Sequence, residues 1–287
     1  MPRLGSAIAV GTRASYVLEG LARRTAASGR GLRAARLGLS PDSSACGLVG
    51  SMASLISDLP GDGSLLIIVD GYSDRSVGAA RLLLEMWGRR SGSAALVFAL
   101  PPLPYEKRLE AKFRFNVGLL ANSLGSGGLL VRVGLGDRML EAPAEDFERA
   151  ALDEMSAVLA DIVARSDRPP LSEFLEAGGR FSLVVGGFSS AEDLALAGAL
   201  EGAPSVAVAA SSASSLLTAA SLAQALGVGV DVAGGTVSYL ITRRDDLGDE
   251  DPIHAALRGR SGGGVPVLDP SPSVPARVDL PLDLYRL

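Results

Sequence analysis

Short apolar runs alternate with longer amphipathic segments along most of this chain, and this alternation restricts its fold more than any other feature. Strand-length runs are predicted at Ala7–Val10, Leu65–Val69, Ala94–Leu100, Leu129–Val133, Phe181–Val185, Ser205–Ala209, Val228–Val232 and Thr236–Thr242. Helix-length segments lie between them, for example Ala14–Ala27, Val77–Trp87, Tyr105–Ser123 and Asp146–Arg165. Strands that alternate with helices favour a parallel sheet with helices on both faces. We therefore predict an α/β fold.

The predicted helix Asp146–Arg165 divides the chain. Its length of about 20 residues corresponds to roughly 30 Å, enough to span a small domain. Pro169 and Pro170 follow it and stop any further helix. We predict an N-terminal domain at 1–145, a central helix at 146–166 and a C-terminal domain at 167–244. Residues 245–287 have the charged, then Gly-rich composition of a linker and tail.

Composition excludes several classes of function. One cysteine and one histidine leave no disulfide framework, no multi-cysteine metal site and no histidine cluster for zinc. The net charge of −5 is spread along the chain, without the clustered basic face of a nucleic-acid-binding protein. The N-terminal apolar run is too short for a signal peptide, so we expect a cytoplasmic protein. Scarce Asn, Gln and Cys fit either a thermophilic source or a GC-rich genome.

The least charged stretch, residues 202–230, is long enough to cross a membrane. It contains many serines and is interrupted by glycines, which favours a strand, a helix and a second strand instead. We therefore expect no transmembrane segment.

Several local sequences resemble the tubulin/FtsZ superfamily in the order in which that family arranges its elements. "LVFALPPLPYEKRLEAKFRFNVGLLANSL" is similar to a strand, a proline-containing turn and a basic helix of FtsZ, and "LLVRVGLGDRMLE" is similar to the strand that follows. "FERAALDEMSAVLADIV" stands in the place of the long central helix. The resemblance covers about residues 5 to 244. It implies a Rossmann-like tubulin/FtsZ N-terminal domain, a long central helix and a smaller α+β C-terminal domain.

The nucleotide-binding loops of the family are only partly matched. The family's signature turn, Gly-Gly-Gly-Thr-Gly-Thr-Gly, uses bare backbone N–H groups to hold phosphates. Here the turn "GYSDRSVG" places an acid, Asp74, among the residues that the resemblance assigns to the phosphate site. That assignment comprises Gly11 and Arg13 in the first loop, Asp42 in the third loop, and Gly71, Ser73, Arg75, Ser76 and Gly78 in the signature turn. Asp74 is either part of a rebuilt phosphate site, with Arg75 supplying positive charge, or an acid placed favourably at a helix start.

The start of the central helix lacks the residues that read guanine in FtsZ. Phe147 matches the family's Phe and is assigned to the nucleotide site, but the two base-reading positions fall on Ala151 and Leu152. Neither side chain has a donor or an acceptor. In the family, acids after the central helix act on the nucleotide of the next subunit. Of those positions only Glu173 keeps an acid, and it is either a catalytic residue or an acid in a helix first turn.

The resemblance leaves two functions open. We favour a non-enzymatic cytoskeletal or regulatory protein, possessing a weak or non-hydrolysing site and no bound cofactor. It would act by assembly with itself or with an FtsZ/tubulin paralogue, in a process such as cell division. The alternative is an active filament-forming GTPase that binds GTP with magnesium. The C-terminal "VDLPLDLYRL" is similar to the FtsZ tail peptide that docks on partner proteins, through Asp279, Leu280, Pro281, Leu284 and Arg286; its other interpretation is an edge strand.

Overall fold

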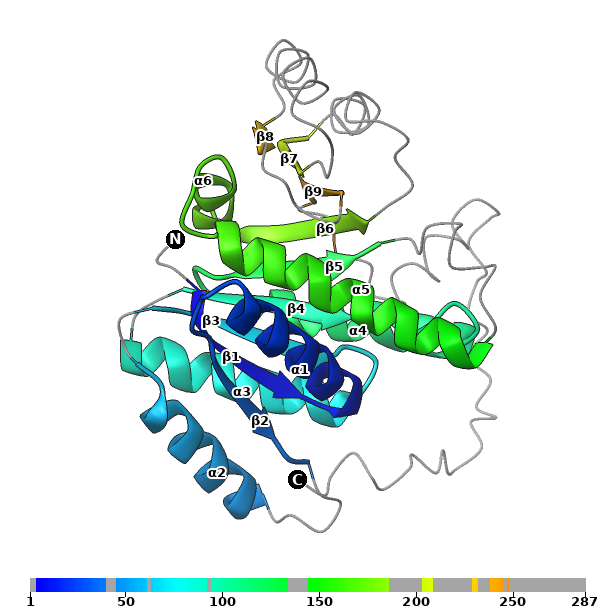
Figure 1. Ribbon diagram of the computed structural model, residues 1–287. Coiled ribbons are helices and arrows are strands. Elements are labelled where there is room, and N and C mark those ends of the chain that lie inside the picture. Colours follow the sequence, from blue (N-terminus) through cyan, green and yellow to red (C-terminus); the bar gives the residue numbers. More distant parts are fainter. Residues whose placement is uncertain are drawn as a thin grey trace, which may run out of the picture.

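The computed structural model describes residues 4–39, 45–60, 63–91, 94–133, 144–185, 203–208, 229–231, 238–244 and 247. Within these residues the strands form one sheet in the order β2-β1-β3-β4-β5-β6-β9-β7-β8 (Figure 1). The strands are β1 (Leu4–Val10), β2 (Arg33–Leu37), β3 (Ser64–Asp70), β4 (Ala95–Leu100), β5 (Gly128–Arg132), β6 (Gly179–Val185), β7 (Ser205–Val208), β8 (Gly229–Asp231) and β9 (Tyr239–Arg243).

Within the described sheet, strand β9 alone runs against the direction of the other strands. From β2 to β6 every neighbouring pair is parallel. Strand β9 runs antiparallel to both of its neighbours, β6 and β7, and β8 is parallel to β7. Every residue of β3 and of β4 is buried, as expected of central parallel strands that are covered on both faces.

Helices cover both faces of the sheet. One face carries α1 (Thr12–Ala27), α5 (Ala144–Arg165) and α6 (Leu171–Glu176), and the other carries α2 (Ala45–Asp58), α3 (Asp74–Ser91) and α4 (Glu110–Ala121) (Figure 1). Successive residues of β3 alternate between two cores. Leu66 and Ile68 belong to the core beneath α1 and α5, whereas Ile67 and Val69 belong to the core beneath α2 and α3.

Helices α1 and α5 lie in very close contact. A Cβ atom on Gly20 would come within 2.5 Å of Ser156 Oγ and 2.7 Å of Ser156 Cβ. The Ser156 hydroxyl donates to the carbonyl oxygens of Val17 (3.1 Å) and Leu152 (2.8 Å), so its polar group is satisfied inside the contact. Further along α5, the Tyr239 hydroxyl donates to Asp161 Oδ2 at 2.8 Å, which ties β9 to the same helix.

The predicted α/β fold is confirmed, and the predicted strands lie within one to three residues of the observed ones. Strand β2 and helix α2 have no predicted counterpart. The predicted helix Tyr105–Ser123 is wrong at its start, because Tyr105 lies in a turn and a short 3₁₀ helix (Lys107–Leu109) precedes α4. The prediction for α3 also starts too late, because Asp74, which was assigned to the turn, is its first residue.

The division into domains stays a prediction. The sheet continues across the predicted boundary, since β5 pairs with β6 along its whole length. Helices predicted between β6 and β9, most of the stretch 202–230, and the tail beyond residue 247 lie outside the described residues.

Candidate functional site

The carboxyl ends of β1 and β3 adjoin where the order of the strands reverses, and open parallel sheets usually bind their ligands at such a point. Gly11 follows β1 and leads directly into α1, and Asp70 ends β3. The starts of α1 and α5 meet here as well, because Arg13 contacts Glu148. We call this region the crevice. It contains most of the residues that the sequence assigns to a nucleotide site.

The backbone at the start of α1 binds a carboxylate of the chain itself. Asp70 Oδ1 accepts a hydrogen bond from the Ala14 N–H at 2.8 Å, and Asp70 Oδ2 accepts one from the Arg13 N–H at 3.3 Å. Asp70 is only 5% exposed. Free N–H groups at such a helix start are the groups that bind phosphate oxygens in nucleotide sites. In this structure the Asp70 carboxylate binds two N–H groups of this kind.

Gly11 allows this close approach. Its φ of 114° lies in the region that favours glycine, and a Cβ atom there would come within 2.3 Å of Asp70 Oδ2. Burial raises the pKa of Asp70 above its ordinary value, and the backbone hydrogen bonds from Ala14 and Arg13 together with the Arg13 charge oppose that rise.

Two carboxylates bind the Arg13 side chain. Its Nη1 and Nη2 donate to the two oxygens of Glu106 at 2.7 and 2.9 Å, and its Nε donates to Glu148 Oε1 at 2.7 Å. The guanidinium also lies over the ring of Tyr72, 5.1 Å from its centroid. The bond to Arg13 holds the pKa of Glu106 below its usual value. Two carboxylates therefore already bind the Arg13 guanidinium.

Local structure explains the residues of the predicted signature turn without a ligand. The Ser73 hydroxyl accepts from the Ser76 N–H at 3.3 Å, as a residue that caps a helix does. Asp74, in the first turn of α3, binds Lys112 Nζ at 2.8 Å and Asn116 Nδ2 at 3.2 Å. Ser76 is buried.

The two glycines of this turn differ. A Cβ atom on Gly71 would come within 2.6 Å of the Phe113 ring, so packing requires a glycine there. A Cβ atom on Gly78 would meet nothing within 4 Å. Arg75 lies half-buried in the first turn of α3 and is the basic residue of this turn that remains a candidate for phosphate contact.

The start of α5 is apolar where FtsZ reads guanine. Phe147 is buried and packs edge-on against Tyr105, with ring centroids 6.3 Å apart. Ala151 is fully buried beside Phe147 and Leu103, and Leu152 belongs to the core under α1. These positions present no polar group to a base.

Glu173 does not join the crevice. Glu173 is exposed in the first turn of α6, beyond the far end of α5. The start of α5 lies at the crevice and Glu173 lies beyond its other end. Because α5 has 22 residues, about 33 Å of helix separates Glu173 from the crevice. Glu173 therefore cannot act on the crevice of its own chain. Asp42 and the five tail residues lie outside the described residues.

Sequence reasoning missed the groups that fill the crevice. Glu106 and Glu148 are 93 and 135 residues from Arg13, too far apart for any spacing rule to connect them. Asp70 was detectable, because it is an acid directly after the apolar run Leu65–Val69. Among the described residues, no acid, histidine or cysteine cluster could hold a metal ion. No helix in this part of the chain is both long and apolar enough to cross a membrane.

Comparison with known proteins identifies the fold through structure alone. The sequence matches no protein-family model and no curated protein. Among solved structures, CetZ2 from Haloferax volcanii, in a GTPγS-bound protofilament, is 13% identical, with 89% of this chain and 99% of that chain covered and a TM-score of 0.58. An empty FtsZ dimer from M. jannaschii is 12% identical, with 83% and 87% covered and a TM-score of 0.55. The chain therefore has the fold of the tubulin/FtsZ proteins.

Proposed function

We propose that this protein is a filament-forming or partner-binding member of the tubulin/FtsZ group whose nucleotide crevice is occupied by its own side chains. It binds GTP weakly, does not hydrolyse it, and acts through assembly with itself or with an FtsZ/tubulin paralogue. The process in which we propose that it acts is cell division.

One observation carries the proposal: the Asp70 carboxylate is hydrogen-bonded to the backbone N–H groups of Arg13 and Ala14. A phosphate at the same N–H groups would have to displace Asp70 or lie beside it. At 4 Å, two like charges repel by about 4 kcal/mol when the effective dielectric constant is about 20. Arg13 cannot offset this repulsion, because Glu106 and Glu148 already bind it.

Assembly has support that does not depend on nucleotide. CetZ2 is described in a protofilament and M. jannaschii FtsZ as an empty dimer, so proteins of this fold associate in both contexts. We extend that association to this chain. A further partner docks on the tail, through Asp279, Leu280, Pro281, Leu284 and Arg286.

The alternative function is an active GTPase that binds GTP with magnesium, and the GTPγS-bound CetZ2 favours it. In that case Asp70 must leave the α1 N–H groups, Arg75 must contact phosphate, and Glu173 of one subunit must reach the crevice of the next. Gly11, Ser73, Ser76 and Gly78 would then line the phosphates.

Sedimentation velocity and negative-stain electron microscopy of the full chain, with and without GTP and magnesium, separate the two functions. We expect the same assemblies in both conditions and no phosphate release above a protein-free control. Assembly that requires GTP, or steady phosphate release, would overturn the proposal in favour of the GTPase. A chain that stays monomeric under both conditions and binds no paralogue would contradict both functions.

A further inference from the structure

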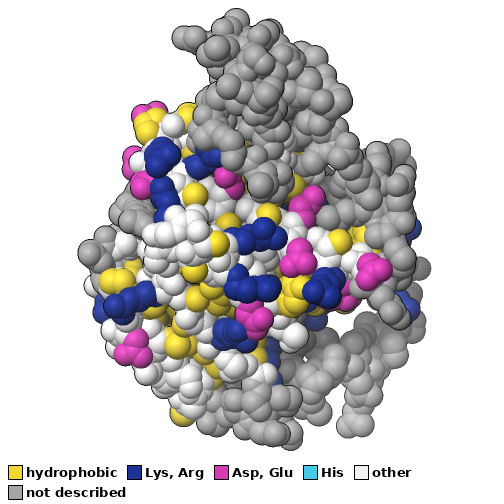
Figure 2. Space-filling view, in the orientation of Figure 1, with side chains coloured by type: hydrophobic (Ala, Val, Ile, Leu, Met, Phe, Trp, Pro, Cys, Tyr) yellow, Lys and Arg dark blue, Asp and Glu magenta, His cyan; other side chains and the backbone are white. Residues whose placement is uncertain are grey.

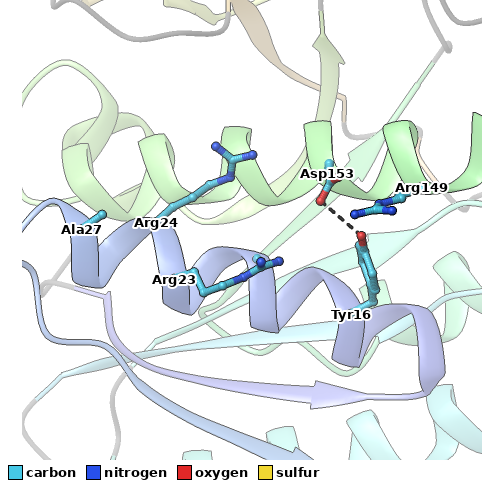
Figure 3. Close-up of a pocket in the computed structure, with 7 residues that line it drawn as sticks. Tyr16, Arg23, Arg24, Ala27, Arg149 and Asp153 are labelled. Atoms are coloured by element: carbon cyan, nitrogen blue, oxygen red, sulfur yellow. Dashed lines mark hydrogen bonds between the residues drawn. The ribbon is translucent and has the colours of Figure 1, made fainter. Parts of the chain in front are cut away.

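A pocket lies between α1 and α5, and its lining includes none of the residues that make the crevice contacts. Its volume is about 330 Å³, and its lining includes Tyr16, Gly20, Arg23, Arg24, Arg149 and Asp153 (Figure 3). Arg23 and Arg24 lie on the last turns of α1. They are about 15 Å along the helix from Arg13, given a rise of about 1.5 Å per residue. We call this the α1–α5 pocket.

The three arginines of this pocket are unusual because their side chains bond to none of the described residues. Most arginines of the described residues form an ion pair or donate to a carbonyl oxygen, as Arg36 does with Glu19 and Arg90 does with Leu59. Arg23, Arg24 and Arg149 are exposed, and none of their guanidinium groups bonds to a described residue. In the described part of the chain, Arg108 is the other exposed arginine whose guanidinium bonds to no described residue.

These arginines therefore concentrate uncompensated positive charge at one place. Figure 2 shows Lys and Arg side chains gathered over the face on which α1 and α5 lie. One acid, Asp153, lines the pocket, and its Oδ1 accepts from the Tyr16 hydroxyl at a long 3.4 Å. Like charges held close together repel one another, and a bound anion removes that repulsion.

The chemistry of the lining indicates the class of anion. Guanidinium groups form paired, charge-assisted hydrogen bonds with phosphoryl oxygens. The volume lies near the lower end of the range for small-molecule sites, roughly 300–1,000 Å³. We propose that the α1–α5 pocket binds a small phosphate-bearing anion with two or more negative charges. This site is separate from the proposed function, because none of its residues contributes to the crevice contacts.

Binding there would link the two helices that meet at Gly20 and Ser156. A ligand that binds only the folded chain raises its stability in proportion to the logarithm of its concentration above Kd. The occupied pocket therefore stabilises the α1–α5 contact.

Calorimetric titration of the full chain with inorganic pyrophosphate, at low ionic strength, tests the proposal. We expect binding that weakens as salt is added. Arg23→Gln, Arg24→Gln and Arg149→Gln should each lower the affinity about tenfold, the loss typical of one charge-assisted contact. Arg108→Gln is the matched control, since it removes another exposed arginine that bonds to none of the described residues and lies outside the pocket, and it should leave the affinity unchanged.

Asp153→Asn should have the opposite effect and tighten binding, which a variant that merely unfolds cannot do. A parallel titration with ADP identifies the source of the anion. Equal affinities for pyrophosphate and ADP indicate recognition of the diphosphate alone, and tighter ADP binding indicates contact with the organic part as well. The proposal is overturned if the wild type binds neither probe. It is also overturned if the three pocket variants bind as wild type, because the anion would then lie in the crevice or elsewhere.

Discussion

Gly20→Ala probes the close contact between α1 and α5. The added methyl group would lie 2.7 Å from Ser156 Cβ, and that atom is fixed to the backbone of α5, so no side-chain rotation relieves the contact. Crowding of this kind costs about 1–3 kcal/mol. Alanine has a better helix propensity than glycine, which offsets up to about 1 kcal/mol of this destabilisation. We therefore expect a net loss of about 1–2 kcal/mol in the free energy of unfolding, measured by urea denaturation.

Two further variants isolate the contact. Gly88→Ala makes the same exchange inside α3, where the new Cβ meets nothing within 4 Å, and it should raise stability by up to about 1 kcal/mol. Ser156→Gly removes both atoms that the new methyl would strike. Combined with Gly20→Ala, it should give a double variant more stable than the sum of the single effects by about 1 kcal/mol. A Gly20→Ala protein stabilised as much as Gly88→Ala would refute this account of the α1–α5 contact, and with it the position of Arg13 beside Glu148.

Three other predictions test the helix, the crevice and the tail. Leu159→Asp buries an unpaired charge at a fully buried position of α5 and should cost at least about 3 kcal/mol, whereas Ala150→Asp on the exposed side of α5 should change little. Burial raises the pKa of Asp70 from its ordinary value of 3.8, so the free energy of unfolding of the wild type, relative to that of Asp70→Asn, should fall as the pH rises from 3.8 through the raised pKa. If urea denaturation gives the same difference in free energy of unfolding at every pH, this prediction is contradicted. Deletion of residues 270–287 should leave Tm unchanged and abolish binding of a tail-docking partner, while a large fall in Tm would instead favour the edge strand.

The sequence predicts the centre of the sheet better than its edge. Strands β3 and β4 are continuous apolar runs because they are buried on both faces, and such runs are visible in one sequence. Strand β2, with the sequence RAARL, lies at the edge, where three of its five residues are exposed. An exposed edge strand needs no apolar run, so its sequence does not distinguish it from a loop.

The candidate site was predictable only in its position. The loops after β1 and β3 were identified from the resemblance, and Asp74 does lie in a helix first turn. The partners of Arg13 come from the turn after β4 and from the start of α5, and only the fold brings these segments together. The hydrogen bonds of Asp70 likewise depend on the pairing of β1 with β3, because this pairing places the Asp70 carboxylate at the start of α1.

Calorimetric titration of the wild-type chain with GTP in the presence of magnesium tests the central claim most directly. Asp70 occupies the α1 N–H groups, Glu106 and Glu148 bind Arg13, and apolar side chains stand at the base-reading positions. Each lost contact of this kind costs about 1–3 kcal/mol, and about 1.4 kcal/mol corresponds to a tenfold loss of affinity. Two or three such losses predict a Kd for GTP that approaches millimolar, with ATP no weaker than GTP. A Kd for GTP at or below about one micromolar, with ATP much weaker, would contradict the account.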